Sequence, residues 1–284
     1  MSFSTSTLPR LLSIAGSDSG GGAGVQADLK AFARCGVHGM TAITAVTAQN
    51  TAGVTAVYEL PGEAIVEQVR AVADDIGVDA VKIGMLGTTF AIEAVDRALD
   101  LLPGAPVVLD PVMVAESGAA LLADDAQEAL RDRLVPRATV LTPNVPEASV
   151  LSGLGDDASP EDLARAVYAL GPAAVVITGG HREDATDWYF DGERLEPIRG
   201  ERQPDGASHG SGCTHSSVLA AHLAQGLDPL EAARRAKAIS EEAVRDGLRE
   251  LGAGAGPVDV LRVGSPGADP SAARTVGPAA AARR

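Results

Sequence analysis

Residues 208–217, Ser-His-Gly-Ser-Gly-Cys-Thr-His-Ser-Ser, run directly into the apolar segment 218–224, Val-Leu-Ala-Ala-His-Leu-Ala. The apolar segment predicts a helix, and the small residues before it would let a ligand approach the backbone closely. Amides in the first turn of a helix lack intrahelical partners, so they favour an anion. Cys213 would lie in that turn, where the helix dipole favours a thiolate, and we expect its pKa to fall toward neutrality. The alternative is a glycine-rich turn before a buried helix that carries an inert cysteine.

The chain around this stretch alternates between short runs rich in Val, Ile and Leu and longer amphipathic segments. This alternation predicts an α/β fold with a central, mostly parallel sheet flanked by helices. Strands are expected at residues 11–15, 42–46, 54–58, 80–83, 107–109, 139–141 and 174–177, with a hairpin at 188–190 and 195–198. Helices are expected at residues 23–36, 62–75, 88–101, 124–134 and 161–167, with two more beginning at Ser211 and Pro229. The closely spaced strands at 42–46 and 54–58 are expected to form a ribbon at the edge of the sheet.

Length and composition predict a single domain. The chain has 284 residues, of which 45% are hydrophobic, with a mean hydropathy of +0.10, which is sufficient for one large core. We place the domain at residues 8–263 and expect the Ala-, Gly- and Pro-rich tail at 264–284 to be disordered.

Charge and cysteine content narrow the classes of function. A net charge of −15 and a pI near 4.7 argue against a nucleic-acid surface, which needs a basic stripe. No apolar segment is long enough for a membrane span and no targeting segment is visible, so we expect a cytoplasmic protein. The two cysteines, Cys35 and Cys213, fit a reducing compartment.

Turn-forming and polar residues follow several of the expected strands. Because ligands bind at the carboxyl ends of parallel strands, these residues are expected to share one edge of the sheet. Each of them alone is explained equally well as a turn residue. The positions are Gly16, Met85, Asp110, Asn144 and Thr178.

Three further residues have side chains suited to ligands. Asp28, one turn into the first helix, could reach a substrate hydroxyl or amine, or could simply be solvated. Gln49 carries an amide that suits the edge of an uncharged heterocycle. Glu147 lies at a helix start and could hold Mg²⁺ through water, or could only complement the helix N-terminus.

Six motifs together resemble the hydroxymethylpyrimidine/phosphomethylpyrimidine kinases of thiamine biosynthesis, which belong to the ribokinase-like group. The resemblance covers residues 11–260. The motifs are AGSDSGGGAGVQADLK at 15–30, TAQNT at 47–51, KIGML at 82–86, LDPVM at 109–113, TPNVPE at 142–147 and HGSGCT at 209–214.

The resemblance implies a three-layer ribokinase-like fold, a homodimer, and small-molecule substrates without nucleic-acid or membrane partners. It implies transfer of phosphate from ATP, with Mg²⁺, to 4-amino-5-hydroxymethyl-2-methylpyrimidine and then to its monophosphate. Cys213 would act as catalytic base, and Gly210, Ser211 and Gly212 would form an anion hole. The pyrimidine would contact Gln49, Gly16, Asp28, Met85 and Val112. The nucleotide and phosphates would contact Asn144, Asp110, Thr178 and Lys237, and the metal would contact Glu147 and Asp110.

One residue departs from the pattern of the family. Many relatives carry lysine before Gly-Gly-His, where this chain has Thr178. Threonine supplies no positive charge, so phosphate neutralisation must come from elsewhere. Two other functions remain open at this stage: a pyridoxal or pyridoxine kinase of the same fold, and a non-catalytic domain that senses the pyrimidine. The retained Cys213, Asn144 and Glu147 argue against the sensor.

Overall fold

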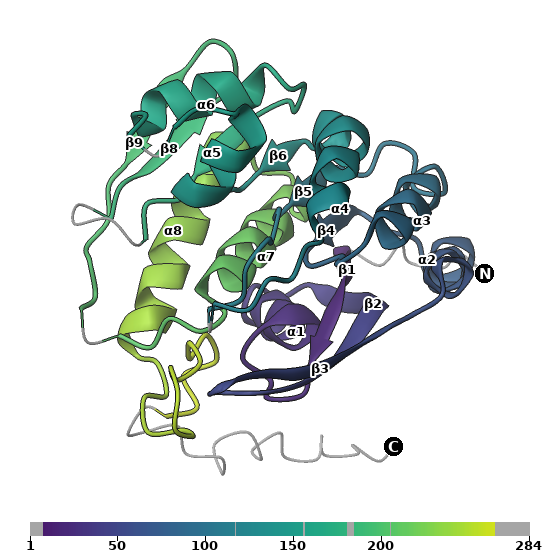
Figure 1. Cartoon of the computed structure of the whole chain (residues 1–284), viewed down its shortest axis with the longest axis horizontal. Helices are drawn as coiled ribbons and strands as arrows, with labels where there is room; N and C mark the ends of the chain where they lie inside the picture. Colours follow the sequence, from purple (N-terminus) through teal and green to yellow (C-terminus); the bar gives the residue numbers. More distant parts are fainter. Residues whose placement is uncertain (1–7, 117, 156, 181–184, 205, 265–284) are drawn as a thin grey trace, which may run out of the picture.

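The computed structural model describes residues 8–116, 118–155, 157–180, 185–204 and 206–264. It is a three-layer α/β arrangement, with a twisted sheet between two layers of helices (Figure 1). The expected tail from residue 265 onward lies outside the described residues. None of the helices in these described ranges is long and apolar enough to span a membrane.

The sheet has nine strands among the described residues, in the order β3-β2-β1-β4-β5-β6-β7-β8-β9. Six central strands run parallel, whereas β3 and β8 pair antiparallel with their neighbours at the two sides. The parallel strands are β1 (Arg10–Asp18), β2 (His38–Asn50), β4 (Ala80–Ile83), β5 (Val107–Leu109), β6 (Val140–Leu141) and β7 (Val175–Ile177). The remaining strands are β3 (Gly53–Glu59), β8 (Asp187–Phe190) and β9 (Leu195–Ile198). The predicted parallel sheet, edge ribbon and hairpin are therefore all present.

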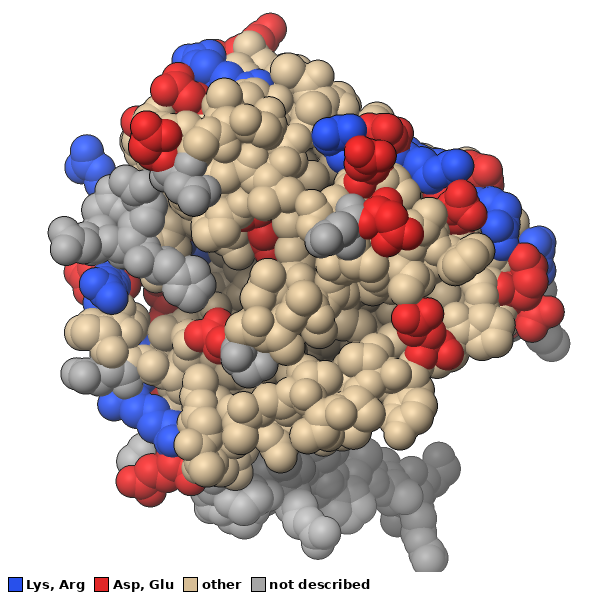
Figure 2. Space-filling view, viewed as in Figure 1, with Lys and Arg blue, Asp and Glu red and all other residues tan. Residues whose placement is uncertain are grey.

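The helices divide between the two faces of the sheet according to their buried residues. One face is covered by α1 (Gly24–Arg34), α7 (Ser211–Ala224) and α8 (Pro229–Arg245). The other is covered by α2 (Gly62–Asp75), α3 (Thr89–Leu99), α4 (Asp124–Ala129), α5 (Val145–Ser152) and α6 (Pro160–Tyr168). Over α2, α3 and α4, Figure 2 shows basic and acidic side chains mixed on the outer surface, so this layer is an ordinary solvated face.

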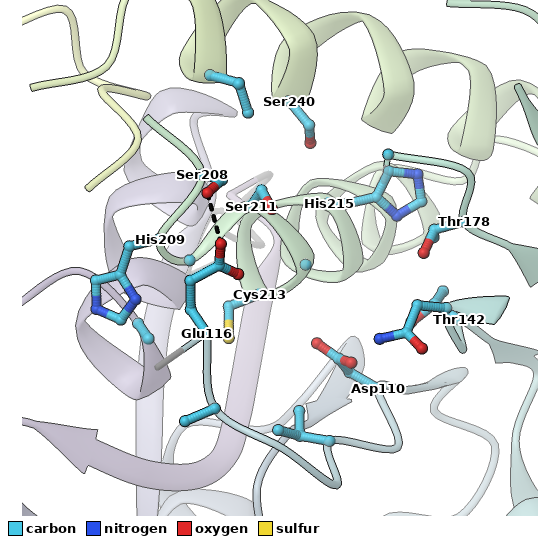
Figure 3. Close-up of a pocket in the computed structure, with 18 of the residues that line it drawn as sticks. Asp110, Glu116, Thr142, Thr178, Ser208, His209, Ser211, Cys213, His215 and Ser240 are labelled. Atoms are coloured by element: carbon cyan, nitrogen blue, oxygen red, sulfur yellow. Dashed lines mark hydrogen bonds between the residues drawn. The ribbon is translucent and has the colours of Figure 1, made fainter. Parts of the chain in front are cut away.

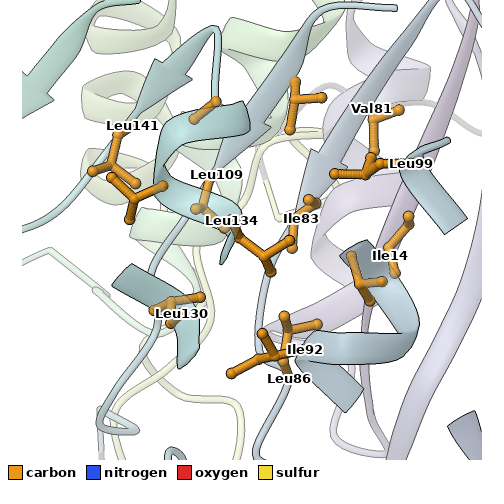
Figure 4. Close-up of a cluster of buried hydrophobic side chains, with 14 of the residues drawn as sticks. Ile14, Val81, Ile83, Leu86, Ile92, Leu99, Leu109, Leu130, Leu134 and Leu141 are labelled. Atoms are coloured by element: carbon orange, nitrogen blue, oxygen red, sulfur yellow. The ribbon is translucent and has the colours of Figure 1, made fainter. Parts of the chain in front are cut away.

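The central strands are apolar on both sides, as expected for strands covered by helices on each face. In β5, for example, Val107 and Leu109 enter the core beneath α3, and Val108 enters the core beneath α7. Figure 4 shows how Ile83, Leu109 and Leu141 of three neighbouring strands continue the first of these cores across the sheet. Each strand therefore fixes its register through two apolar cores.

The structure changes the bounds of three predicted elements by three or more residues: β1, which continues to Asp18 and so contains Gly16, β2, and the helix predicted at 124–134. Strand β2 extends well beyond the predicted 42–46, because its polar residues Thr47 and Gln49 hid its end from the hydrophobic pattern. The helix predicted at 124–134 is α-helical only to Ala129, then continues as a π-helical turn (Leu130–Leu134) and a 3₁₀ turn (Val135–Arg137).

Candidate active site

A pocket of about 400 Å³ lies at the carboxyl ends of the parallel strands, between the sheet and the start of α7. Figure 2 shows this face of the molecule hollowed near its centre. Every predicted site residue except Asp28 lines this pocket: Gly16, Gln49, Met85, Asp110, Val112, Asn144, Glu147, Thr178, Gly210, Ser211, Gly212, Cys213 and Lys237. The strand ends thus meet as expected, while the role of each residue stays a prediction.

The start of α7 provides backbone donors at the pocket. Gly210, the residue before the helix, has φ +83°, and a Cβ there would lie 1.8 Å from the carbonyl oxygen of Gly22, so only glycine fits. The Ser211 amide donates to the carbonyl of Ser208 at 3.0 Å. The amides of Gly212 and Cys213 have no hydrogen-bond partner among the described residues. Of the three residues predicted to form an anion hole, only Ser211 therefore has its amide occupied, and the role of the group stays a prediction.

Cys213 lies on the pocket wall, but its environment contradicts the expected near-neutral thiol. Burial raises the pKa of Cys213 to about 12; Lys82 opposes this rise, and the carboxylates of Asp110 and Asp28 add to it. Figure 3 shows its sulfur directed into the same space as the carboxylate of Asp110. The helix dipole was expected to dominate, but it is outweighed by desolvation and by neighbouring negative charge.

The prediction that Asp28 contacts substrate is wrong, because its side chain is fully buried behind the pocket. Its carboxylate pairs with the Lys82 ammonium at 3.0 Å. Two hydroxyls also donate to it, Ser13 Oγ at 2.5 Å and Ser217 Oγ at 2.7 Å. Asp28 therefore clamps β1, β4 and α7 together beneath the site.

Lys82 connects this clamp to the pocket. Its Nζ lies 4.0 Å from the carboxylate of Asp110, which also accepts a hydrogen bond from Ser216 at 3.0 Å. Burial would lower the pKa of Lys82, but Asp28, Cys213 and Asp110 outweigh it, and the net pKa lies above its ordinary value. The ammonium is therefore charged, although carboxylates surround it.

Glu147 performs the structural role considered for it and also faces the pocket. Its Oε2 accepts the Asn144 amide at 2.9 Å, while Asn144 Oδ1 accepts the Glu147 amide at 2.9 Å, a reciprocal cap at the start of α5. Burial and the nearby Asp110 carboxylate raise the pKa of Glu147 to about 8. Two buried carboxylates that repel one another are suited to a cation.

These carboxylates fit a magnesium ion. No group of three or more His, Cys, Asp or Glu side chains gathers as a metal site within the described part of the chain. Magnesium usually takes one or two carboxylates and completes its shell with water and phosphate oxygens. Asp110 and Glu147 match that pattern.

A second charged cluster lines the pocket wall formed by β8, α7 and α8. The buried carboxylate of Asp187 lies 3.0 Å from Lys237 Nζ and 3.3 Å from His215 Nε2, and it accepts the Gly179 amide at 2.8 Å. Lys237 also pairs with Glu241 at 3.3 Å. Burial raises the pKa of Asp187, but its contacts with His215 and Lys237 outweigh this effect, and the net pKa is lowered.

The glycine-rich loop at 16–24 is held by its own carboxylate. Asp18 accepts the amides of Gly20, Gly22 and Ala23 at 2.7–3.0 Å, and it lies 3.2 Å from His209 Nε2. These loop amides are consequently occupied, which agrees with the absence of a nucleotide-loop pattern in this segment.

A side-chain hydrogen bond joins two segments of the pocket lining. Ser208 Oγ donates to the carboxylate of Glu116 at 2.6 Å, as Figure 3 shows. This bond joins the segment after β5 to the segment before α7.

Several site residues were missed in the sequence, and two of them left a recognisable pattern. Ser13 and Lys82 are polar residues inside otherwise apolar strands, and such residues need buried partners. Asp187 and His215 left no comparable pattern, since each is an isolated polar residue whose partners lie far away in the chain.

Comparisons with known proteins agree with this geometry. A family model described as phosphomethylpyrimidine kinase matches residues 18–259. The hydroxymethylpyrimidine/phosphomethylpyrimidine kinase of Streptomyces coelicolor is 48% identical over 89% of this chain and 94% of its own. The thiamine biosynthesis bifunctional protein ThiED of Geobacter sulfurreducens is 44% identical over 88% of this chain and 51% of its own. An ADP complex of Bacillus subtilis pyridoxal kinase superimposes with a TM-score of 0.83, at 38% identity over 90% of this chain and 100% of that chain.

Proposed function

The chain belongs to the phosphomethylpyrimidine kinase family, and from that membership we propose how its pocket works as an ATP-dependent phosphotransferase of thiamine biosynthesis. The reaction transfers phosphate to 4-amino-5-hydroxymethyl-2-methylpyrimidine and then to the monophosphate. The observation that carries the mechanism is the meeting of the α7 amides, Cys213 and the Asp110–Glu147 pair in one pocket.

In this mechanism the first half of the chain holds the ring. Gly16 leaves space beside the side chain of Met85, since a Cβ at Gly16 would lie 2.4 Å from the Met85 methyl carbon. Gln49 at the end of β2 and Val112 after β5 complete this wall. The hydroxymethyl group would then point toward Cys213.

The start of α7 supplies most of the transition-state stabilisation. Phosphoryl transfer depends mainly on positioning and charge, so the unpaired amides of Gly212 and Cys213 are suited to the phosphoryl oxygens. The sulfur of Cys213 would accept the substrate hydroxyl proton late in the reaction. Bound Mg²⁺, held by Asp110 and Glu147, would neutralise phosphate charge and favour the thiolate.

Gln49→Ala tests the ring site. Gln49 is half-buried at the end of β2, and its Oε1 accepts the Thr47 hydroxyl at 3.0 Å, so its amide nitrogen remains to meet a heterocycle. Loss of this hydrogen bond should raise the KM for hydroxymethylpyrimidine by about fivefold to tenfold while the KM for ATP changes less than twofold. Steady-state kinetics with each substrate varied in turn measures both values. Equal increases in the two KM values would show that Gln49 does not bind the ring.

A coupled ADP-release assay tests the reaction itself. Purified protein is supplied with ATP and Mg²⁺ and with hydroxymethylpyrimidine, its monophosphate or pyridoxal in separate reactions. We expect turnover of the first two compounds, and a higher kcat/KM for hydroxymethylpyrimidine than for pyridoxal. Pyridoxal kinase is the second candidate, because the B. subtilis enzyme shares the fold over its whole length. Turnover of pyridoxal alone would select that candidate, and ADP release from none of the compounds would indicate a sensor.

The proposal includes a cytoplasmic homodimer. ATP is a cytoplasmic substrate, and both cysteines of the chain are free thiols. The edge ribbon exposes Val46, Val57 and Tyr58, at 43%, 47% and 65% of their surfaces, and a second copy of the chain would cover such apolar residues.

A further inference from the structure

The two buried basic groups of the pocket are already neutralised by acidic neighbours. Among the described residues, its lining contains seven Asp or Glu side chains and three Lys or Arg side chains. Lys82 is paired with Asp28, and Lys237 is shared between Asp187 and Glu241. Arg202 is exposed at the rim. A nucleotide polyphosphate would therefore meet little net positive charge from these side chains.

His215 is the unexplained polar group of this pocket. It is 5% exposed and lines the pocket. Its Nε2 lies 3.3 Å from Asp187 Oδ2 and pairs with that carboxylate, whereas Nδ1 has no partner among the described residues. Buried polar atoms are nearly always paired, so an unpartnered Nδ1 at a pocket wall points to a missing ligand.

The location of His215 indicates which ligand it serves. The residue lies on α7, and Figure 3 shows it on the same wall as Thr178 and well away from His209. This wall is formed by α7, α8, β8 and the end of β7, whereas Gly16, Gln49 and Met85 lie in or just after β1, β2 and β4, in the other half of the strand order. His215 therefore faces the part of the pocket that is left for the nucleotide.

We propose that His215 binds the polyphosphate of the nucleotide and supplies the positive charge that Thr178 cannot. The inference rests on the proposed kinase function. An imidazole that donates to a phosphate oxygen while its other nitrogen faces the Asp187 carboxylate carries hydrogen on both nitrogens, so it is a cation. Lys237 and Glu241 on α8 and Asp110 after β5 are the other charged groups around it. A salt bridge with Asp187 would hold the ring in place for this contact.

Binding of the non-hydrolysable nucleotide AMP-PCP to the full-length chain tests this proposal. Isothermal titration calorimetry with Mg²⁺ should show that His215→Leu raises the Kd for AMP-PCP by about 10- to 100-fold, the effect expected for a lost hydrogen bond to a charged group. The Kd for hydroxymethylpyrimidine should change less than twofold. His222→Leu is the matched control, because His222 lies on the same helix, outside the pocket, and bonds the carbonyl of Val218.

Two further variants separate charge from packing. Thr178→Lys places an ammonium on the same wall. The double variant with His215→Leu should therefore recover at least half of the change in log Kd for AMP-PCP that His215→Leu causes. His215→Gln retains a donor and should lie between wild type and His215→Leu, with thermal unfolding midpoints recorded for all variants. An unchanged Kd in His215→Leu would overturn the proposal, as would failure of Thr178→Lys to restore binding. Tight AMP-PCP binding by a wild-type chain that phosphorylates no pyrimidine would instead count against the proposed function alone.

Discussion

Cys213→Ala is expected to lower kcat for hydroxymethylpyrimidine by about 10²- to 10⁴-fold, the usual contribution of a general base. The Kd for the pyrimidine should stay within about twofold, because the proposed ring contacts of Gly16, Gln49 and Met85 are retained. Rapid-quench measurement of the first turnover separates transfer from product release. A kcat within threefold of wild type would show that Cys213 does not accept the substrate proton.

The pH dependence of the wild type, with Cys213→Ala as the control, distinguishes a thiol of high pKa from one of near-neutral pKa. Since burial raises the pKa of Cys213 to about 12, the thiolate fraction should rise about tenfold per pH unit below that value. We therefore expect kcat/KM of the wild type to increase between pH 7 and 9. Without the metal, burial and Asp110 raise the pKa of Glu147 to about 8, so Cys213→Ala is the control for a contribution from Glu147. If kcat/KM of Cys213→Ala rises over the same pH range, the rise comes from Glu147. If kcat/KM of the wild type is already constant from pH 7 upward, the pKa of the thiol is near neutral.

Lys82→Met is expected to reduce the free energy of unfolding by about 3–5 kcal/mol, the cost of breaking a buried ion pair. The substitution keeps the length of the side chain but leaves the carboxylate of Asp28 buried, with only the hydroxyls of Ser13 and Ser217 as partners. Urea unfolding followed by circular dichroism measures the change.

Two other variants define the origin of that loss. Asp28→Asn combined with Lys82→Met should recover most of the stability, because no unpaired charge is then buried. Arg97→Met breaks a surface pair with Glu63 and should cost less than about 1 kcal/mol. If the double variant is no more stable than Lys82→Met alone, the loss comes from packing and not from charge.

One pattern in the sequence predicted both the fold and the pocket. Short apolar runs predicted the parallel strands, and the turn-forming residues at their ends predicted the residues around the pocket. Asp110 and Asn144 lie about thirty residues apart, yet parallel strands bring their ends to one edge regardless of the intervening helices. Membership in the family, the α/β class and the kinase function were all predicted and are confirmed by the comparisons.

The errors concern long-range electrostatics. From its own helix, Asp28 is expected to face substrate or solvent. Its burial is explained only by the ion pair with Lys82, which is distant in the sequence. The prediction for Cys213 considered the helix that contains it, but the pKa of the thiol depends on burial and on carboxylates from other elements. Local periodicity carries no information about such contacts.

The division of the pocket between two halves of the chain has an evolutionary consequence. Residues proposed for the ring come from β1, β2 and the segments after β4 and β5, whereas the start of α7 and the wall with His215 and Lys237 follow later in the chain. Substitutions in the early strands could thus alter which heterocycle is chosen without disturbing the groups that handle phosphate. A new vitamin precursor would then be accepted through a few changes near Met85, on an inherited catalytic apparatus.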